Sequence, residues 1–243
     1  MLIGVPKEIK QNENRVALTP GIALDLTQQG HDVLMEKTAG ISSGFSDSDY
    51  EAVNCHLVDS PKEIFENVEI VVKVKEPQNE EIALCSPDLT MFTYFHFAAS
   101  EKLTKLFLET GATAIAYETI MAKDGSLPLL IPMSEVAGRM SVQEGAKFLE
   151  KVKGGRGILL GGVPGVEPAK VTILGGGIVG TNAALIAAGL GANVFILDIN
   201  LNRLRYLDEI MPKNVRTIYS NQFNIREHLK QTDLLIGAVL IPG

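Results

Sequence analysis

Short apolar segments alternate with segments of helical pattern along the first half of the chain. The apolar segments are rich in β-branched residues and too short for buried helices, so they predict strands. They lie at residues 2–5, 31–36, 69–75, 89–97 and 113–118. The helical segments carry start signals, such as Thr19 before Pro20 and Ser100 before residues 101–109. This alternation predicts a mostly parallel sheet with helices on both faces.

The alternation continues after a Gly- and Pro-containing connection at residues 123–132, where Ser134 is expected to cap a long helix. Strands are predicted at 171–174, 193–198, 215–219 and 233–240, with helices between them. We therefore predict an α/β protein with two doubly wound parallel-sheet domains, residues 1–130 and 131–243. The second is expected to be an incomplete Rossmann domain, because a full doubly wound sheet has about six strands.

Residues 170–198, KVTILGGGIVGTNAALIAAGLGANVFILD, have the order of parts expected of a dinucleotide-binding unit. Gly175, Gly177 and Gly180 form G-x-G-x-x-G between a strand and an alanine-rich helix. Such glycines allow a tight turn, close approach of a pyrophosphate and close helix–strand packing. The second strand ends on Asp198, whose carboxylate can accept hydrogen bonds from a ribose diol and repel a 2′-phosphate. The order of these parts favours an NAD site over an ordinary βαβ turn.

Composition and charge narrow the possible partners. The chain has 243 residues and a formal net charge of −7, which argues against nucleic acid or an anionic membrane as a partner. Cys55 and Cys85 match neither metal-ligand nor C-x-x-C spacing, so we expect reduced thiols and no metal. No signal peptide and no membrane-spanning apolar run is evident. These features predict a cytoplasmic protein.

Three residues in the first half are candidates for chemistry. His96 ends the predicted strand MFTYFH, where an imidazole could transfer protons, although a core histidine bonded to backbone would fit equally. Lys75 and Lys73 share a face of EIVVKVK, and one of them could bind a carboxylate or carbonyl oxygen, or both could be edge-strand lysines. Arg15 lies in an irregular loop, where its guanidinium could hold a carboxylate in bidentate fashion or be solvated.

The remaining ionisable residues are assigned no chemistry. Three histidines are expected to be surface residues: His31, His56 and His228. Two acidic pairs are expected to be solvated or to cap helices: Asp47/Asp49 and Glu80/Glu81. No Ser-His-Asp arrangement can be argued from the pattern.

The whole sequence resembles the alanine dehydrogenase family. The resemblance lies in the segments GVPKEIKQNENRVALTP, VVKVKEP, FTYFHFAAS, PMSEVAGRMS, GILLGGVPGV, VTILGGGIVGTNAA and LLIGAVLIPG. Relatives of that family include the NAD-binding part of proton-translocating transhydrogenase and the saccharopine dehydrogenases, but PMSEVAGRMS and GILLGGVPGV favour the alanine enzymes.

The resemblance implies reversible, NAD-dependent oxidative deamination of L-alanine to pyruvate and ammonium by a homohexamer. It implies that Arg15 holds the substrate carboxylate, that Lys75 contacts the carboxylate or carbonyl oxygen, and that His96 is the general acid and base. The implied NAD contacts are Ser134, Asp198, Arg203, Ser220, Val239 and Leu240.

The sequence departs from the family pattern at its end. Family members continue well past the LIPG motif, through further strands and an aspartate that works beside the histidine. We therefore expect a C-terminally truncated chain with severely reduced turnover. Two alternatives remain: a non-catalytic NAD-binding remnant, or a transhydrogenase-like nucleotide-binding module that needs a partner to move the hydride.

Overall fold

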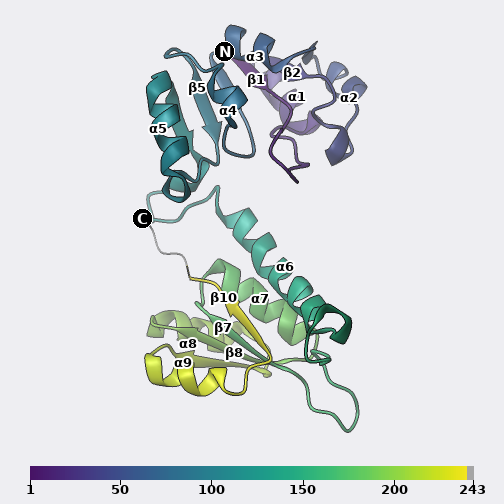
Figure 1. The fold of residues 1–243 in the computed structure, drawn as a ribbon, viewed down its shortest axis with the longest axis vertical. Coiled ribbons are helices and arrows are strands. Elements are labelled where there is room, and N and C mark those ends of the chain that lie inside the picture. Colours follow the sequence, from purple (N-terminus) through teal and green to yellow (C-terminus); the bar gives the residue numbers. More distant parts are fainter. Residues whose placement is uncertain (240–243) are drawn as a thin grey trace. The chain divides into compact units, whose positions relative to one another are not determined.

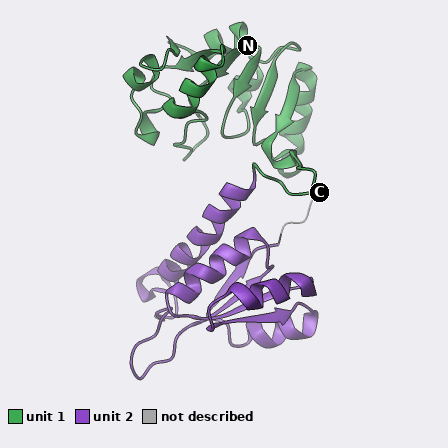
Figure 2. Ribbon diagram, turned by 180° about the vertical axis from the view of Figure 1, so that it is seen from behind, with its two compact units in different colours: residues 1–129 green, residues 130–243 purple. Residues whose placement is uncertain are grey.

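The chain divides into two compact units, Met1–Leu129 (unit 1) and Leu130–Gly243 (unit 2), which Figure 2 shows in different colours. The computed structural model describes residues 1–239. Each unit contains one parallel sheet with its own hydrophobic core. The predicted α/β class with two parallel sheets is therefore confirmed.

Unit 1 is a six-stranded sheet with the strand order β3-β2-β1-β4-β5-β6, parallel throughout. Its strands are β1 (Leu2–Val5), β2 (Asp32–Glu36), β3 (His56–Val58), β4 (Ile70–Val72), β5 (Thr90–Thr93) and β6 (Thr113–Ala116). Its α-helices are α1 (Pro20–Gln28), α2 (Asp47–Glu51), α3 (Pro61–Asn67), α4 (Asn79–Ile82) and α5 (Glu101–Thr110). The chain runs outward from β1 to β3 and then returns to β4, so the strand order reverses between β1 and β4.

The sequence signals explain much of this sheet. The apolar strand residues Val5, Val33, Val71 and Met91 have no exposed surface, as expected for strands covered on both faces. The predicted helix starts are confirmed, because α1 begins at Pro20 after Thr19 and α5 begins after Ser100, whose hydroxyl accepts the Leu103 amide. Gly111 then ends α5 in the left-handed conformation.

Two predicted strands are shorter than expected, and the reason is the same for both. The predicted strand at 69–75 ends at Val72, and the predicted strand at 89–97 ends at Thr93. Beyond each end, a glutamate carboxylate accepts backbone N–H groups: Glu8 accepts those of Val74 and Lys75, and Glu118 accepts those of Phe95 and His96. Side chains therefore accept these N–H groups at the two strand ends, where one backbone hydrogen bond, from Tyr94 N–H to the Val74 carbonyl at 3.4 Å, still joins the strands.

Unit 2 contains a four-stranded parallel sheet with the order β10-β7-β8-β9. Its strands are β7 (Lys170–Leu174), β8 (Asn193–Asp198), β9 (Val215–Tyr219) and β10 (Leu234–Gly237). Its α-helices are α6 (Ile131–Leu149), α7 (Ile178–Gly189), α8 (Leu201–Ile210) and α9 (Gln222–Leu229). Short 3₁₀ turns occur at Ile41–Ser43, Phe97–Ala99, Tyr117–Thr119 and Lys151–Lys153. The order matches the first four strands of the doubly wound nucleotide-binding sheet.

Helix α6 runs beside α7 in Figure 1, and small residues let the two helices approach closely. A Cβ on Gly138 of α6 would lie 2.3 Å from the carbonyl oxygen of Val179 in α7. The expected start of α6 is wrong, because the helix begins at Ile131, with Leu130 as its N-cap and Pro132 in its first turn. Ser134 consequently lies inside the helix, where its amide donates to the Leu130 carbonyl.

Candidate functional site

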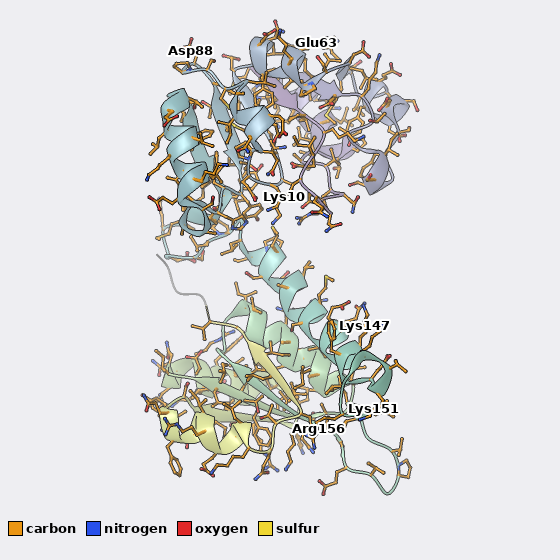
Figure 3. All side chains as sticks on the ribbon, in the orientation of Figure 1. Lys10, Glu63, Asp88, Lys147, Lys151 and Arg156 are labelled. Atoms are coloured by element: carbon orange, nitrogen blue, oxygen red, sulfur yellow. The ribbon has the colours of Figure 1, made fainter. Side chains whose placement is uncertain are left out.

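The candidate site of unit 1 lies where the strand order reverses, because ligands of open α/β sheets bind at the carboxyl ends of the strands on either side of such a point. The loops after β1 and β4 meet at this edge. Lys10, labelled in Figure 3, forms an ion pair with Glu76, which joins the two loops. Arg15 belongs to the first loop and Lys75 to the second.

The structure shows that Lys73 and Lys75, between which the sequence could not choose, have different surroundings. Lys73 is buried, with its ammonium 3.1 Å from Glu8 Oε2 and 2.6 Å from Glu81 Oε1. Lys75 lies past the end of β4 and is only half-buried. Of the two, Lys75 is therefore the residue whose ammonium can meet a ligand.

Glu81 was expected to be solvated or to cap a helix. It does cap helix α4, since its Oε2 accepts the Gln78 amide at 2.8 Å. The residue is only 2% exposed, however, so the expectation of a solvated side chain is wrong. Burial raises the pKa of the Glu81 carboxyl, and the nearby Lys73 charge opposes this rise.

Arg15 already holds a carboxylate in the described structure. Its Nε lies 2.8 Å from Glu13 Oε1 and its Nη2 lies 2.5 Å from Glu13 Oε2, which is a bidentate arrangement. The Glu13 pKa is lowered to about 2, chiefly by the hydrogen bonds from Arg15 and in smaller part by the Lys75 charge. Arg15 and Lys75 are thus two cations that act on one carboxylate.

The prediction that His96 ends a strand is wrong. His96 lies three residues beyond the end of β5 and has the left-handed conformation, with φ 53° and ψ 39°. Its side chain is exposed, which contradicts the alternative of a core histidine. The Glu118 carboxylate accepts the His96 amide at 2.6 Å and fixes this strained backbone. The ring stacks on Tyr94 with 6.1 Å between centroids. The imidazole is therefore exposed and starts from a fixed backbone.

Tyr94 connects His96 to the interior of unit 1. Its hydroxyl donates to the Leu129 carbonyl, and its ring packs edge-on against Tyr117. Burial raises the pKa of the Tyr94 hydroxyl; the Arg15 charge opposes this rise and the Glu118 charge adds to it. The sequence did not indicate that Tyr94, Glu118 and Glu13 belong to the candidate site. Tyr94 and Glu118 contact segments far away in the sequence, and Glu13 is part of no recognisable motif.

The glycine loop of unit 2 has the geometry that its motif predicts. Gly175 has φ 102°, which an L side chain rarely adopts, and a Cβ on Gly180 would lie 1.9 Å from the Gly175 carbonyl oxygen. A Cβ on Gly177 would meet nothing within 4 Å, so this side of the loop is open to a ligand. The role of Gly177 in phosphate binding stays a prediction.

Asp198 and Arg203 hold the Gly176 peptide from opposite sides. Asp198 Oδ2 accepts the Gly176 amide at 2.6 Å, and its Oδ1 accepts the Asn200 amide at 2.8 Å. Arg203 Nε donates to the Gly176 carbonyl at 2.6 Å, and its Nη2 donates to Thr181 Oγ1 at 2.8 Å. Both residues, predicted to contact NAD, therefore also shape the glycine loop.

The other predicted NAD contacts are brought together only in part. Ser220 follows β9, and its amide donates to the Asp198 carbonyl at 2.9 Å. Val239 lies beside the glycine loop, since a Cβ on Gly175 would lie 3.1 Å from its Cγ2. Within residues 1–239, no hydrogen bond joins Ser134 to these residues. Leu240 lies outside the described residues.

Two neighbouring hollows of unit 2 lie at the other edge of its sheet. One of about 260 Å³ is lined by residues that include Lys170, Phe195 and His228, and a neighbouring hollow includes Asn193 and Asn214. These residues mark the amino ends of the strands, which is the edge opposite the glycine loop. We place the candidate nucleotide site at the glycine loop, because that edge carries the amides and the carboxylate that fit a dinucleotide.

Within residues 1–239, no group of three or more His, Cys, Asp or Glu side chains is arranged to hold a metal ion. None of the helices in this range is long and apolar enough to cross a membrane.

The sequence matches two family models in succession. These are described as "Alanine dehydrogenase/PNT, N-terminal domain", over residues 4–137, and "Alanine dehydrogenase/PNT, C-terminal domain", over residues 141–243. The chain is 56% identical to an alanine dehydrogenase of Methanococcus maripaludis and 55% identical to one of Bacillus subtilis, in each case over all 243 residues. It covers 65% and 64% of those two proteins, so it spans about two thirds of their length.

Solved structures give the same picture. An L-alanine dehydrogenase superposes with a TM-score of 0.93 at 53% identity, over 100% of this chain and 67% of that one. A transhydrogenase of Sinorhizobium meliloti superposes with a TM-score of 0.82 at 23% identity, over 100% of this chain and 70% of that one. The second likeness shows a shared fold.

Proposed function

This chain belongs to the alanine dehydrogenase/PNT family, and on that premise we propose that it takes part in the NAD-dependent oxidative deamination of L-alanine. L-alanine, NAD⁺ and water would give pyruvate, ammonium, NADH and a proton, reversibly. The observation that carries the proposal is the bidentate hold of Arg15 on a carboxylate that also feels the Lys75 charge. Alanine and pyruvate both present such a carboxylate.

The residues of unit 2 fit NAD. The open side of Gly177 and the first amides of α7 can receive a pyrophosphate, and Asp198 can accept from a ribose diol. When bound, the nicotinamide supplies the acceptor for the hydride that leaves the substrate Cα. Asp198 would also repel a 2′-phosphate, which supports NAD over NADP.

The residues of unit 1 would bind the substrate and move protons. Arg15 would orient the carboxylate, and Lys75 would contact the carboxylate or carbonyl oxygen and stabilise negative charge that develops there. His96 would deprotonate the water that adds to the imine and would protonate the departing amine. Its exposed imidazole and fixed backbone suit this exchange of protons.

The proposed assembly and location follow from the same premise. We propose a homohexamer in the cytoplasm, with a small-molecule substrate and neither nucleic acid nor membrane as a partner. Light scattering of the purified chain at several concentrations measures its assembly, and a mass other than six chains would contradict the hexamer.

The proposed reaction is tested by the absorbance of NADH formed from L-alanine and NAD⁺, with D-alanine as the control substrate. We expect formation only with L-alanine. Binding of NADH should be measured in parallel by its fluorescence. NADH binding without any turnover would overturn the enzymatic proposal and leave a nucleotide-binding module.

Replacing Asp198 with asparagine is expected to weaken NADH binding by about tenfold, the effect of losing one charge-assisted hydrogen bond. The asparagine oxygen can still accept the Gly176 amide, while the hydrogen bond from the Asn200 amide is lost. Because the repelling charge is gone, the preference for NADH over NADPH should shrink. Titration with both nucleotides checks this, with exposed Glu209→Gln as the charge control. An unchanged preference would show that Asp198 does not set it.

Replacing Glu13 with glutamine is expected to tighten pyruvate binding, because Glu13 competes with the substrate carboxylate for Arg15. The gain should reach up to about fivefold, given the ~0.2–1 kcal/mol of a partly exposed ion pair. Calorimetric titration with pyruvate measures it, and exposed Glu51→Gln serves as the control. Weaker binding would mean instead that Glu13 orients Arg15 for the substrate.

A further inference from the structure

Glu8 lies in the loop after β1, but its carboxylate contacts the chain that follows β4. Its Oε1 accepts the amide of Val74 at 2.6 Å and that of Lys75 at 3.3 Å. Its Oε2 accepts from the Lys73 ammonium at 3.1 Å. The Glu8 side chain is 3% exposed, so these contacts are made away from water.

We propose that Glu8 is a positioning residue for Lys75, fixing the main chain that presents the Lys75 ammonium to the substrate carboxylate. This inference rests on the proposed function of the site. Lys75 lies three residues past the end of β4 and one residue beyond Val74, whose carbonyl accepts the Tyr94 amide at 3.4 Å. The N–H and carbonyl of Lys75 itself are bonded by side chains and not by the neighbouring strand.

Both peptide groups of Lys75 are held by side chains. Glu8 accepts its N–H, and the Thr93 hydroxyl donates to its carbonyl at 2.8 Å. Thr93 has no exposed surface and is the last residue of β5. The Lys75 main chain is therefore fixed between the loop after β1 and the neighbouring strand, while its own side chain remains available to a ligand.

The Lys73 ammonium holds the Glu8 carboxylate in place, and Glu81 contacts that ammonium from its other side. The Lys73 side chain is completely buried, and its ammonium lies between the carboxylates of Glu8 and Glu81. Buried ion pairs contribute little net stability, because removing the charges from water costs about as much as their attraction returns. A role in positioning accounts for these three buried charges better than a role in stability does.

Glu8→Gln and Glu81→Gln form a matched pair of variants in the full chain. Each removes one buried carboxylate from Lys73, and each parent side chain is 3% exposed. In Glu8→Gln the NH₂ group must face either the Lys73 ammonium or the Val74 and Lys75 amides, which are all donors, so the hold on the Lys75 backbone is weakened. Glu81→Gln disturbs Lys73 from the other side.

We expect both variants to lower the unfolding temperature, but only Glu8→Gln to weaken pyruvate binding. Its dissociation constant should rise by about tenfold or more, the usual consequence of misplacing a binding group by a fraction of an ångström. Hydrogen exchange at the Val74 and Lys75 amides should accelerate in Glu8→Gln and stay unchanged in Glu81→Gln. NADH binding should be the same in all three proteins, because its residues lie in unit 2.

Thr93→Val tests the same idea without changing charge, in case Glu8→Gln does not fold. It removes the hydroxyl that holds the Lys75 carbonyl and keeps the shape of the side chain. We expect weaker pyruvate binding here as well. The positioning role would be overturned if Glu8→Gln bound pyruvate as tightly as the unaltered chain does. If Glu8→Gln does not fold, the same result for Thr93→Val would overturn it. An unaltered chain that binds no pyruvate would overturn the proposed function, and this inference with it.

Discussion

Replacing His96 with asparagine is expected to reduce alanine-dependent NADH formation by about 10²–10⁴-fold, the usual contribution of a positioned general acid or base. Asparagine suits the variant, because it tolerates the left-handed backbone of this position and cannot transfer the proton. The His96 side chain is exposed, and the amide that Glu118 accepts remains in the variant. The fold should therefore be unchanged.

The control for this variant is His56→Asn, which alters an exposed histidine of β3 in the same unit. Steady-state rates of NADH formation should be unaffected in that control. NADH binding should be the same in both variants. Turnover that survives in His96→Asn would remove His96 from the proposed chemistry and direct attention to Tyr94 or Glu118.

Replacing Gly180 with alanine is expected to destabilise unit 2 by at least about 3 kcal/mol, the upper part of the usual cost of overpacking. The added Cβ would lie 1.9 Å from the Gly175 carbonyl oxygen. This oxygen belongs to the backbone of the tight turn and cannot move aside as a flexible side chain could. Thermal unfolding should show the loss, and NADH binding should disappear with it.

Variants at two other glycines distinguish an effect on folding from an effect on NADH binding. Gly189 lies in the same helix, and a Cβ there would meet nothing within 4 Å, so Gly189→Ala should be neutral or stabilising. Gly177→Val should fold as the unaltered chain does, since that position is open, yet it should lose NADH binding. A Gly180→Ala variant that unfolds at the normal temperature would contradict the close contact in the structure.

The sequence predicted the parts of the fold that depend on local pattern. The nucleotide-binding unit was recognisable because its strand, glycines, helix and terminal Asp198 all lie within residues 170–198. Helix α3 and strand β3 were not predicted, although Ser60 before Pro61 carries the start signal of that helix. Both elements are short, so a periodic pattern had little length in which to appear.

The sequence could not separate Lys73 from Lys75, because period-two alternation places both on one face of a strand. The structure separates them through Glu8, which lies 65 residues before Lys73 and accepts the amides beyond Val72. Similarly, Glu118 sets the conformation of His96 from 22 residues away. Contacts between distant segments leave no local signal, and they decide which side chains of the candidate site face a ligand.

The position of Ser134 shows another limit of local pattern. Serine before a helical run is a good N-cap signal, but α6 begins at Ile131, three residues earlier. Pro132 fits the first turn of a helix because its missing N–H has no partner there in any case. The local pattern places Pro132 at the end of the connection, whereas the structure places it in the first turn of α6.

The most direct test of the proposed reaction follows the hydrogen on the substrate Cα. L-alanine deuterated at Cα and NAD⁺ should be incubated with the chain, and the NADH formed should be analysed by mass spectrometry. We expect NADH that carries one deuterium, together with an equal amount of pyruvate. NADH without deuterium, or no NADH from a folded chain that binds the nucleotide, would contradict alanine oxidation by hydride transfer.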